Sequence, residues 1–165
     1  MITHHPNDAL LLDYASGAAS EPMSLLIASH VALCPICRQK VSEYETIGGA
    51  FVEECGPEVV SPGLKAETLS VLDGLLDAKP SAKKVQKEQS FGDNIRIPQP
   101  LRSYCGSNND GEKWQWAGFG IKKLPLIENN DKYDCYMLSI RSGTKVPSHD
   151  HGGSEWTLVL DGAFT

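Results

Sequence analysis

Residues 30–37 read His-Val-Ala-Leu-Cys-Pro-Ile-Cys and place one imidazole and two thiols at positions i, i+4 and i+7. On a helix these positions fall within roughly 60° of one another. Because Pro35 lacks a backbone N–H, we expect one helix to end near His30 and another to begin at Pro35. In either arrangement His30, Cys34 and Cys37 converge, and a tetrahedral zinc ion needs one further ligand.

The pair His4-His5 near the N-terminus offers that fourth ligand, so a structural zinc site is the favoured interpretation. A second interpretation is redox chemistry, because Cys-Pro-Ile-Cys resembles the dithiol of thioredoxin-like proteins. That fold places the motif after a strand, whereas the twenty residues before it here have a helical pattern. Two inert core cysteines are the third interpretation.

The chain has 165 residues, of which 41% are hydrophobic, enough to bury the core of one domain or two small ones. Residues 1–12 have neither the charged nor the apolar region of a signal peptide. No apolar run reaches the length of a transmembrane helix. We therefore expect a cytoplasmic protein in which the five cysteines are reduced and a close cysteine pair binds metal.

The charge is unevenly distributed along the chain. Residues 1–80 hold four Lys and Arg against eleven Asp and Glu, a net charge of −7, whereas residues 81–165 have a net charge of +1. An acidic half of this kind is a poor binder of phosphate, so we expect no direct contact with nucleic acid. It suits a basic protein surface, although a merely solvated acidic face would have the same composition.

Apolar periodicity predicts helices in the N-terminal half. Asn7 or Asp8 is expected to cap the first helix, with a stripe of Leu10, Leu11, Tyr14, Ala15 and Ala18. A second helix follows Pro22. The third, from Pro35, carries the stripe Val41, Tyr44, Gly48, Phe51 and Cys55, which predicts that Cys55 is a buried hydrophobic residue and not a ligand. The fourth opens at Ser61-Pro62 and carries Leu64, Val71, Leu72, Leu75 and Leu76.

From residue 91 onward the pattern changes to short alternating stretches separated by turn residues. They cover residues 114–121, 135–140 and 156–160, with a turn expected at residues 129–131. This pattern is typical of an antiparallel sandwich or barrel. Residues 79–92 have no face to bury and are expected to form a linker.

His149, His151 and Glu155 form a second candidate metal site within the strand pattern. Residues two apart in a strand face the same side, and Glu155 has the parity to join the two histidines. Two imidazoles and a carboxylate suit zinc, non-haem iron, manganese or nickel. The alternative is a polar hairpin with incidental histidines.

Residues 143–162 read Gly-x5-His-x-His-x3-Glu-x6-Gly, which matches the first motif of the cupin family at every fixed position. The N-terminal half resembles the zinc-binding anti-sigma domain, with its His-x3-Cys-x-x-Cys signature and an upstream histidine. Together, over nearly the whole chain, the two halves resemble the ChrR-type anti-sigma factors. The stretch His5-Pro-Asn-Asp-Ala-Leu-Leu resembles the N-terminus of that family, which implies that His5 is the fourth zinc ligand.

The resemblance implies an α+β chain composed of a helical zinc-binding domain (1–78), a linker (79–92) and the N-terminal part of a cupin β-barrel (93–165). It implies a cytoplasmic regulator, not an enzyme, that sequesters an extracytoplasmic-function sigma factor. Oxidative stress, such as singlet oxygen or peroxide, would be sensed with the cupin part and would release the sigma factor. The implied metals are zinc at His5, His30, Cys34 and Cys37 and a second divalent metal, such as zinc, at His149, His151 and Glu155.

The chain departs from the cupin pattern in one respect. Cupins have a second motif that supplies a further histidine ligand, and Thr165 is reached before such a motif occurs. The strand at 156–160 would then lack neighbours, and an unpaired apolar edge is unfavourable. We therefore expect the missing strands to come from a continuation of the natural chain or from a partner chain, with the β part as a candidate oligomer contact. The alternative function is a dioxygenase-like cupin enzyme with an appended zinc module.

Overall fold

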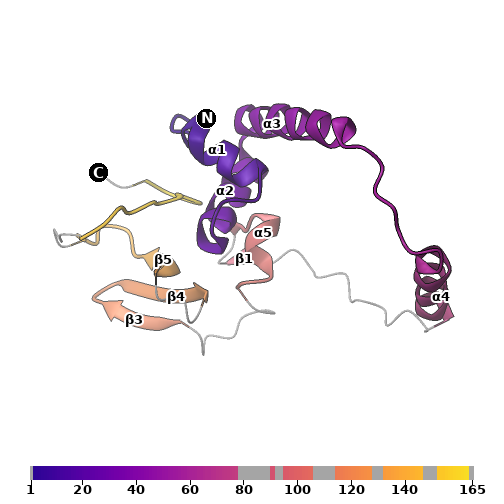
Figure 1. Cartoon of the computed structure of the whole chain (residues 1–165). Helices are drawn as coiled ribbons and strands as arrows, with labels where there is room; N and C mark the ends of the chain where they lie inside the picture. Colours follow the sequence, from indigo (N-terminus) through magenta and orange to yellow (C-terminus); the bar gives the residue numbers. More distant parts are fainter. Residues whose placement is uncertain are drawn as a thin grey trace.

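The computed structural model describes residues 2–77, 90–91, 95–105, 114–127, 132–146 and 152–163, in which a helical region precedes a small antiparallel sheet (Figure 1). The N-terminal helices are α1 (Asp8–Ala15), α2 (Glu21–Leu33), α3 (Pro35–Glu54) and α4 (Leu64–Asp77). They are followed by β1 (Ser90–Phe91), β2 (Ile95–Arg96), the short helix α5 (Gln99–Arg102), β3 (Gln115–Gly118), β4 (Ile121–Ile127) and β5 (Cys135–Ile140). This order confirms the α+β prediction at the level of a helical region followed by a sheet. Within the described ranges, no helix is long and apolar enough to span a bilayer.

The first helix begins where the capping residues predict. Asn7 is the N-cap of α1, and its side-chain oxygen accepts a hydrogen bond of 2.9 Å from the backbone N–H of Leu10. This bond satisfies one of the amide groups that the first helical turn leaves without a partner. Gly17 follows the helix with φ of +74°, a left-handed conformation that favours glycine. The chain can therefore turn sharply from α1 into α2.

The break between α2 and α3 lies at Cys34, directly before Pro35. Cys34 has φ of −109° and ψ of 107°, so it is extended, and Pro35 is the first residue of α3. The prediction of two helices that separate at this proline is confirmed. Because only one residue separates them, the end of α2 and the start of α3 are held side by side.

One buried cluster holds α1, α2 and α3 together. Its buried members are Leu11, Ile27, Cys34, Cys37 and Val41. Leu10, Tyr14 and Tyr44 pack against it from the partly exposed rim. The two cysteines of the Cys-Pro-Ile-Cys motif are thus part of the core as well as candidate ligands.

The distal half of α3 and the whole described surface of α4 lie outside this core. Phe51 is 66% exposed, and every residue of α4 from 64 to 75 is exposed. Cys55 is exposed as well, so the prediction that it is buried is wrong. The periodicity correctly marks one apolar face of α3, but only Val41 and Tyr44 on that face meet another helix. The side chain of Leu76 lies outside the described residues.

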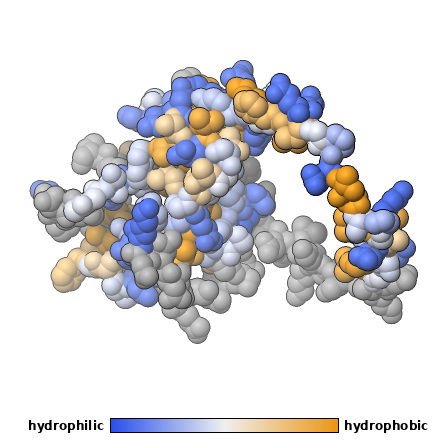
Figure 2. All heavy atoms as spheres, in the orientation of Figure 1, coloured by the Kyte–Doolittle hydropathy of each residue, from blue (hydrophilic) through white to orange (hydrophobic). Residues whose placement is uncertain are grey.

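Hydrophobic residues consequently appear on the surface of α4 and of the segment that leads to it (Figure 2). Figure 1 shows α4 standing apart from α1, α2 and α3. The helix begins at Leu64, two residues after the expected proline start, because Pro62 and Gly63 form a turn.

The C-terminal half contains a three-stranded antiparallel sheet in the order β3-β4-β5. The turn at Phe119-Gly120 joins β3 to β4 within the first alternating stretch. Pro125 lies inside β4 opposite Tyr136, and the register shifts directly after it. A proline cannot donate to the ladder, so an irregularity at this position is expected. The short strands β1 and β2 pair separately, and β1 lies at the end of the stretch that was expected to be a linker.

The expected strand at residues 156–160 is not paired in any ladder of the described residues. Alternating apolar residues favour an extended chain, but a strand also needs a neighbour that satisfies its backbone. The described part of the C-terminal half is therefore a small sheet and not a closed barrel. The expected turn at residues 129–131 lies outside the described residues, as do residues 79–89 and 92 of the expected linker.

A second buried cluster joins α2 to the C-terminal half. Leu25 of α2 packs with Ile97 and Leu101, and all three are at most 7% exposed. The residues packed around them are Tyr104, Cys105, Leu126, Ile127, Cys135, Met137 and Leu160. The segment around the short helix α5 therefore packs in one cluster with α2 and with residues of the sheet.

The first core yields a prediction for stability. Leu11 is fully buried, whereas its neighbour Leu12 is 50% exposed. Replacing Leu11 by Ala should lower the free energy of unfolding by about 2–5 kcal/mol, because it leaves a cavity between three helices. Urea unfolding followed by circular dichroism measures the change. Leu12→Ala is the matched control, and a loss as large as that of Leu11→Ala would contradict the assigned core.

Candidate metal centre

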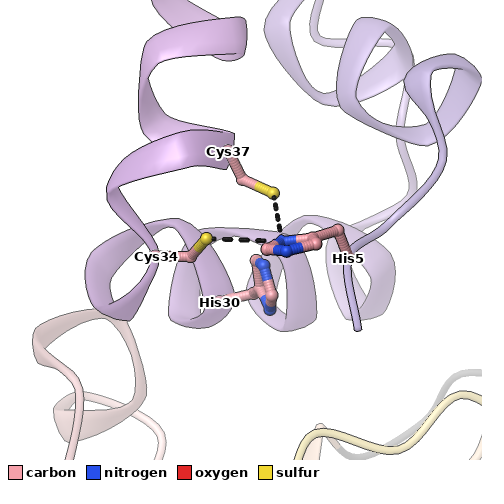
Figure 3. Close-up of side chains that lie close together, drawn as sticks. All are labelled: His5, His30, Cys34 and Cys37. Atoms are coloured by element: carbon pink, nitrogen blue, oxygen red, sulfur yellow. Dashed lines mark hydrogen bonds between the residues drawn. The ribbon is translucent and has the colours of Figure 1, made fainter. Parts of the chain in front are cut away.

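Four side chains of the helical region meet at one point (Figure 3). His5 comes from the segment before α1, and His30 comes from the last turn of α2. Cys34 lies at the break, and Cys37 lies in the first turn of α3. One ligand atom from each of the four residues lies within 4.8 Å of the others. The break at Cys34 produces this convergence, because it turns the two thiols back toward the end of α2.

The spacing of these atoms fits a tetrahedral ion. The Nδ1 atom of His5 lies 3.4 Å from the Sγ atom of Cys34 and 3.4 Å from the Sγ atom of Cys37. Nitrogen and sulfur ligands of a tetrahedral zinc ion are separated from each other by about 3.5 Å. The rings of His5 and His30 meet edge to face, with centroids 5.8 Å apart and an interplanar angle of 87°. The residues present therefore fit a zinc ion by donor type and by spacing.

The burial of His30 favours the neutral imidazole, which is the form that binds a metal ion. Its Nε2 atom is buried and has no hydrogen-bond partner in the described part of the chain. A buried polar atom without a partner is costly, and a metal ion would satisfy it. Burial lowers the pKa of His30, and the nearby His5 lowers it further. Both effects favour the uncharged imidazole that metal binding requires.

Burial favours the protonated form of the Cys37 thiol. Burial raises its pKa to about 11, and the hydrogen bond with Cys34 adds to this effect. A raised pKa makes the Cys37 thiol a poor nucleophile. Metals bind the thiolate, so a divalent ion at this site would displace the proton of Cys37. Cys34 and Cys37 are free cysteines, and the motif follows a helix and not a strand.

Arg38 supports the cluster, although the ligand pattern does not single it out. Its Nε donates to the carbonyl of Val31 at 3.2 Å, and its Nη2 donates to the carbonyl of Ala32 at 2.9 Å. These carbonyls belong to the last turn of α2, where helical partners are lacking. The bonds fix the turn that carries both thiols. A basic residue four positions after the break is the only sequence signal for this role.

The other histidine and cysteines of the described chain lie away from the cluster. His4 is exposed, and its Nδ1 is 3.1 Å from the hydroxyl of Thr3. The structure thus places His5, and not His4, beside the two thiols. Cys55 lies at the end of α3, whereas Cys105 and Cys135 belong to the second buried cluster.

The second predicted site is described only in part. His149 and His151 lie outside the described residues, and Glu155 is exposed. Burial raises the pKa of Tyr136, and the negative charge of Glu155 adds to the increase. Glu155 therefore lies within electrostatic range of β5. Among the described residues, the cluster of His5, His30, Cys34 and Cys37 is the one group of three or more potential ligands that come together.

Comparison with known proteins assigns the chain to a family. It is 34% identical to the anti-sigma-E factor ChrR of Cereibacter sphaeroides over 163 residues, which cover 99% of this chain and 72% of the relative. In the crystal structure of Rhodobacter sphaeroides SigE in complex with the anti-sigma ChrR, one chain matches with a TM-score of 0.69 and 29% identity. That match covers 93% of this chain and 74% of the other. No family model matches.

An anti-sigma factor is a regulator, so this relationship confirms the prediction that the chain is not an enzyme. The identity extends over both the helical region and the sheet, as the resemblance drawn from the motifs predicts. The chain belongs to the family of ChrR-type anti-sigma factors.

Proposed function

We propose that this chain sequesters an extracytoplasmic-function sigma factor through the helices α1–α4, and that a zinc ion at His5, His30, Cys34 and Cys37 holds these helices in place. The observation that carries the proposal is the four-ligand cluster at the edge of the helical core, with His30, Cys34 and Cys37 buried and His5 exposed, in a chain related to an anti-sigma factor over 99% of its length. The related complex contains the sigma factor SigE, which indicates the class of partner. Such a partner acts in the cytoplasm, where we also place this chain.

The exposed apolar face of α4 supports a protein partner. Leu72 is 49% exposed and Leu75 is 65% exposed, and Val59 in the preceding segment is 93% exposed. Exposed apolar residues gathered on one helix mark interaction sites, because leaving them in water is unfavourable. We propose that the sigma factor covers this face.

The charge of the helical region indicates the kind of surface that it meets. The net charge of −7 over residues 1–80 favours a basic partner, such as a protein that binds nucleic acid. Complementary charge speeds association and sets the orientation of two proteins. An acidic regulator would thus compete with nucleic acid or RNA polymerase for a basic sigma surface without contacting nucleic acid itself.

The metal assignment predicts that each ligand is needed for zinc retention. His30→Asn and Cys37→Ser should each lower bound zinc from about one equivalent to less than about 0.2, because structural zinc sites need four ligands. Inductively coupled plasma mass spectrometry of the purified full chain measures the zinc content. His4→Asn and Cys55→Ser are the matched controls and should retain wild-type zinc. Retention of zinc by the His30 and Cys37 variants would exclude this ligand set.

The partner assignment predicts a selective effect on α4. Leu72→Glu or Leu75→Glu should weaken sigma binding by about tenfold or more, because each places a charge in an apolar contact. Sigma factors of the extracytoplasmic-function class from the same organism are first screened by pull-down. The affinity of the retained one is then measured by calorimetry.

Two controls separate this contact from the fold. Phe119→Glu alters a fully exposed apolar residue in the sheet region and should leave the affinity unchanged. Both α4 variants should retain zinc, whereas His30→Asn should lose zinc and sigma binding together. Loss of zinc in the Leu72 or Leu75 variant would mean that α4 packs on the bundle.

We further propose that residues 93–165 are part of a cupin barrel that binds a second divalent metal, such as zinc, at His149, His151 and Glu155 and senses oxidative stress. The motif Gly-x5-His-x-His-x3-Glu-x6-Gly and the antiparallel sheet support this assignment. The boundaries of 1–78 for the helical domain, 79–92 for the linker and 93–165 for the barrel belong to the same proposal. The barrel would also be the contact of any oligomer.

This assignment predicts a second, independent metal equivalent. The double variant His149→Ala/His151→Ala should lose about one metal equivalent and keep the zinc of the helical cluster, because the two sites share no ligand. Metal content measured on the wild type and the variant, side by side, gives the difference. Equal metal content in the two proteins would contradict the second site.

A further inference from the structure

Helix α2 is buried on two sides. Ile27 contributes to the first core beside α1 and α3, whereas Leu25, two residues earlier, packs against Ile97 and Leu101 of the C-terminal half. Residues two apart on a helix point in nearly opposite directions. Figure 1 shows α2 between α1 on one side and α5 on the other. The helix that carries the ligand His30 is therefore also the surface on which the C-terminal half docks.

A polar contact at the start of α2 adds to this docking. The hydroxyl of Tyr104 donates a hydrogen bond of 2.9 Å to the carboxylate of Glu21. Cys135 of β5 packs against the same buried cluster as Tyr104, and the charge of Glu21 adds to the effect of burial in raising the pKa of its thiol. The contact thus joins α2, the segment 97–105 and the sheet at one place.

The docking segment is itself well fixed. Pro98 and Leu101 are buried, and the Nε of Arg102 donates to the carbonyl of Ile97 at 3.3 Å. The neighbouring Cys105 is buried enough for its pKa to be raised to about 11. On the α2 side, the hydroxyl of Ser29 donates to the carbonyl of Leu25 at 2.7 Å. Both surfaces are therefore ordered by contacts of their own.

We propose that segment 97–105, called the clasp below, holds the C-terminal half against α2. The metal centre at one end of the helix and the docked C-terminal half at the other would then stabilise each other. Glu21 and His30 are about 14 Å apart along α2. A rigid helix transmits a displacement over that length without bending. Opening the clasp would loosen α2 and the ligand His30 with it. Loss of the metal would in turn loosen the clasp, because coupling between two sites is reciprocal.

This inference rests on the proposed metal centre, and it adds a way in which the C-terminal half would regulate metal retention there. A change in the C-terminal half could reach the helices that carry the ligands without any direct contact with the metal. Segment 97–105 would then affect metal retention as well as connect the two halves of the chain.

The first test is the rate of metal release from the zinc-loaded full chain. Transfer of zinc to the chelating dye 4-(2-pyridylazo)resorcinol is followed by absorbance. Leu101→Ala should speed release by at least about tenfold, because it opens a cavity under α2. Tyr104→Phe keeps the ring and removes the hydrogen bond to Glu21, so it should speed release by about two- to fivefold. Leu138→Ala, at an exposed position of β5, is the control and should release zinc at the wild-type rate.

The second test works in the reverse direction on the wild type. Alkylation by iodoacetamide, resolved by peptide mass spectrometry, is compared before and after zinc removal by a chelator. Labelling of Cys105 and Cys135 should become at least about tenfold faster when local opening exposes them. Cys55 is exposed in the folded chain and should be labelled at the same rate in both states.

The outcomes separate the clasp from the proposed function. A wild type that binds no zinc would overturn both the metal centre and the clasp. Zinc-loaded wild type together with an unchanged release rate in Tyr104→Phe and Leu101→Ala would overturn the clasp alone. Unchanged labelling of Cys105 and Cys135 after zinc removal would overturn it as well, even if Leu101→Ala fails to fold.

Discussion

The convergence of His5, His30, Cys34 and Cys37 is the constraint on which the helical region depends. Its core has five buried members, and two of them are the cysteines of the cluster. A hydrophobic core of this size contributes little to stability. A structural zinc ion contributes on the order of 10 kcal/mol to the folding of a small module. Most of the free energy that stabilises the fold of α1–α3 would therefore come from metal binding.

The position of α2 follows from its composition. It is apolar around most of its circumference, which is typical of a helix buried on more than one side. One side packs on α1 and α3, and the other receives Ile97 and Leu101. Although α2 lies near the N-terminus, it thus occupies the centre of the described structure. The ligand that it carries is placed where both halves of the chain influence it.

Short-range chemistry was predictable from the sequence, whereas contacts between distant segments were not. The grouping of His30, Cys34 and Cys37 follows from residue type and spacing, but spacing left His4 and His5 open as the fourth ligand. The predicted burial of Cys55 is wrong, because periodicity identifies an apolar face and not what covers it. Among the described residues, the stretch 156–160 is unpaired for the same reason, since alternation cannot supply a paired neighbour. No local sequence pattern indicates the contact of Tyr104 with Glu21, because these residues are 83 positions apart in the chain.

The apolar residues of α4 take part in neither buried core. The first core is formed by α1, α2 and α3, and the second by α2, α5 and the sheet, and neither includes a described side chain of α4. An isolated helix of 14 residues is only marginally stable in water. Its apolar stripe and the acidic charge around it thus favour a second protein as the source of further stabilisation. Burial of the leucines would supply the affinity of such a complex, and the charge would determine which partner approaches.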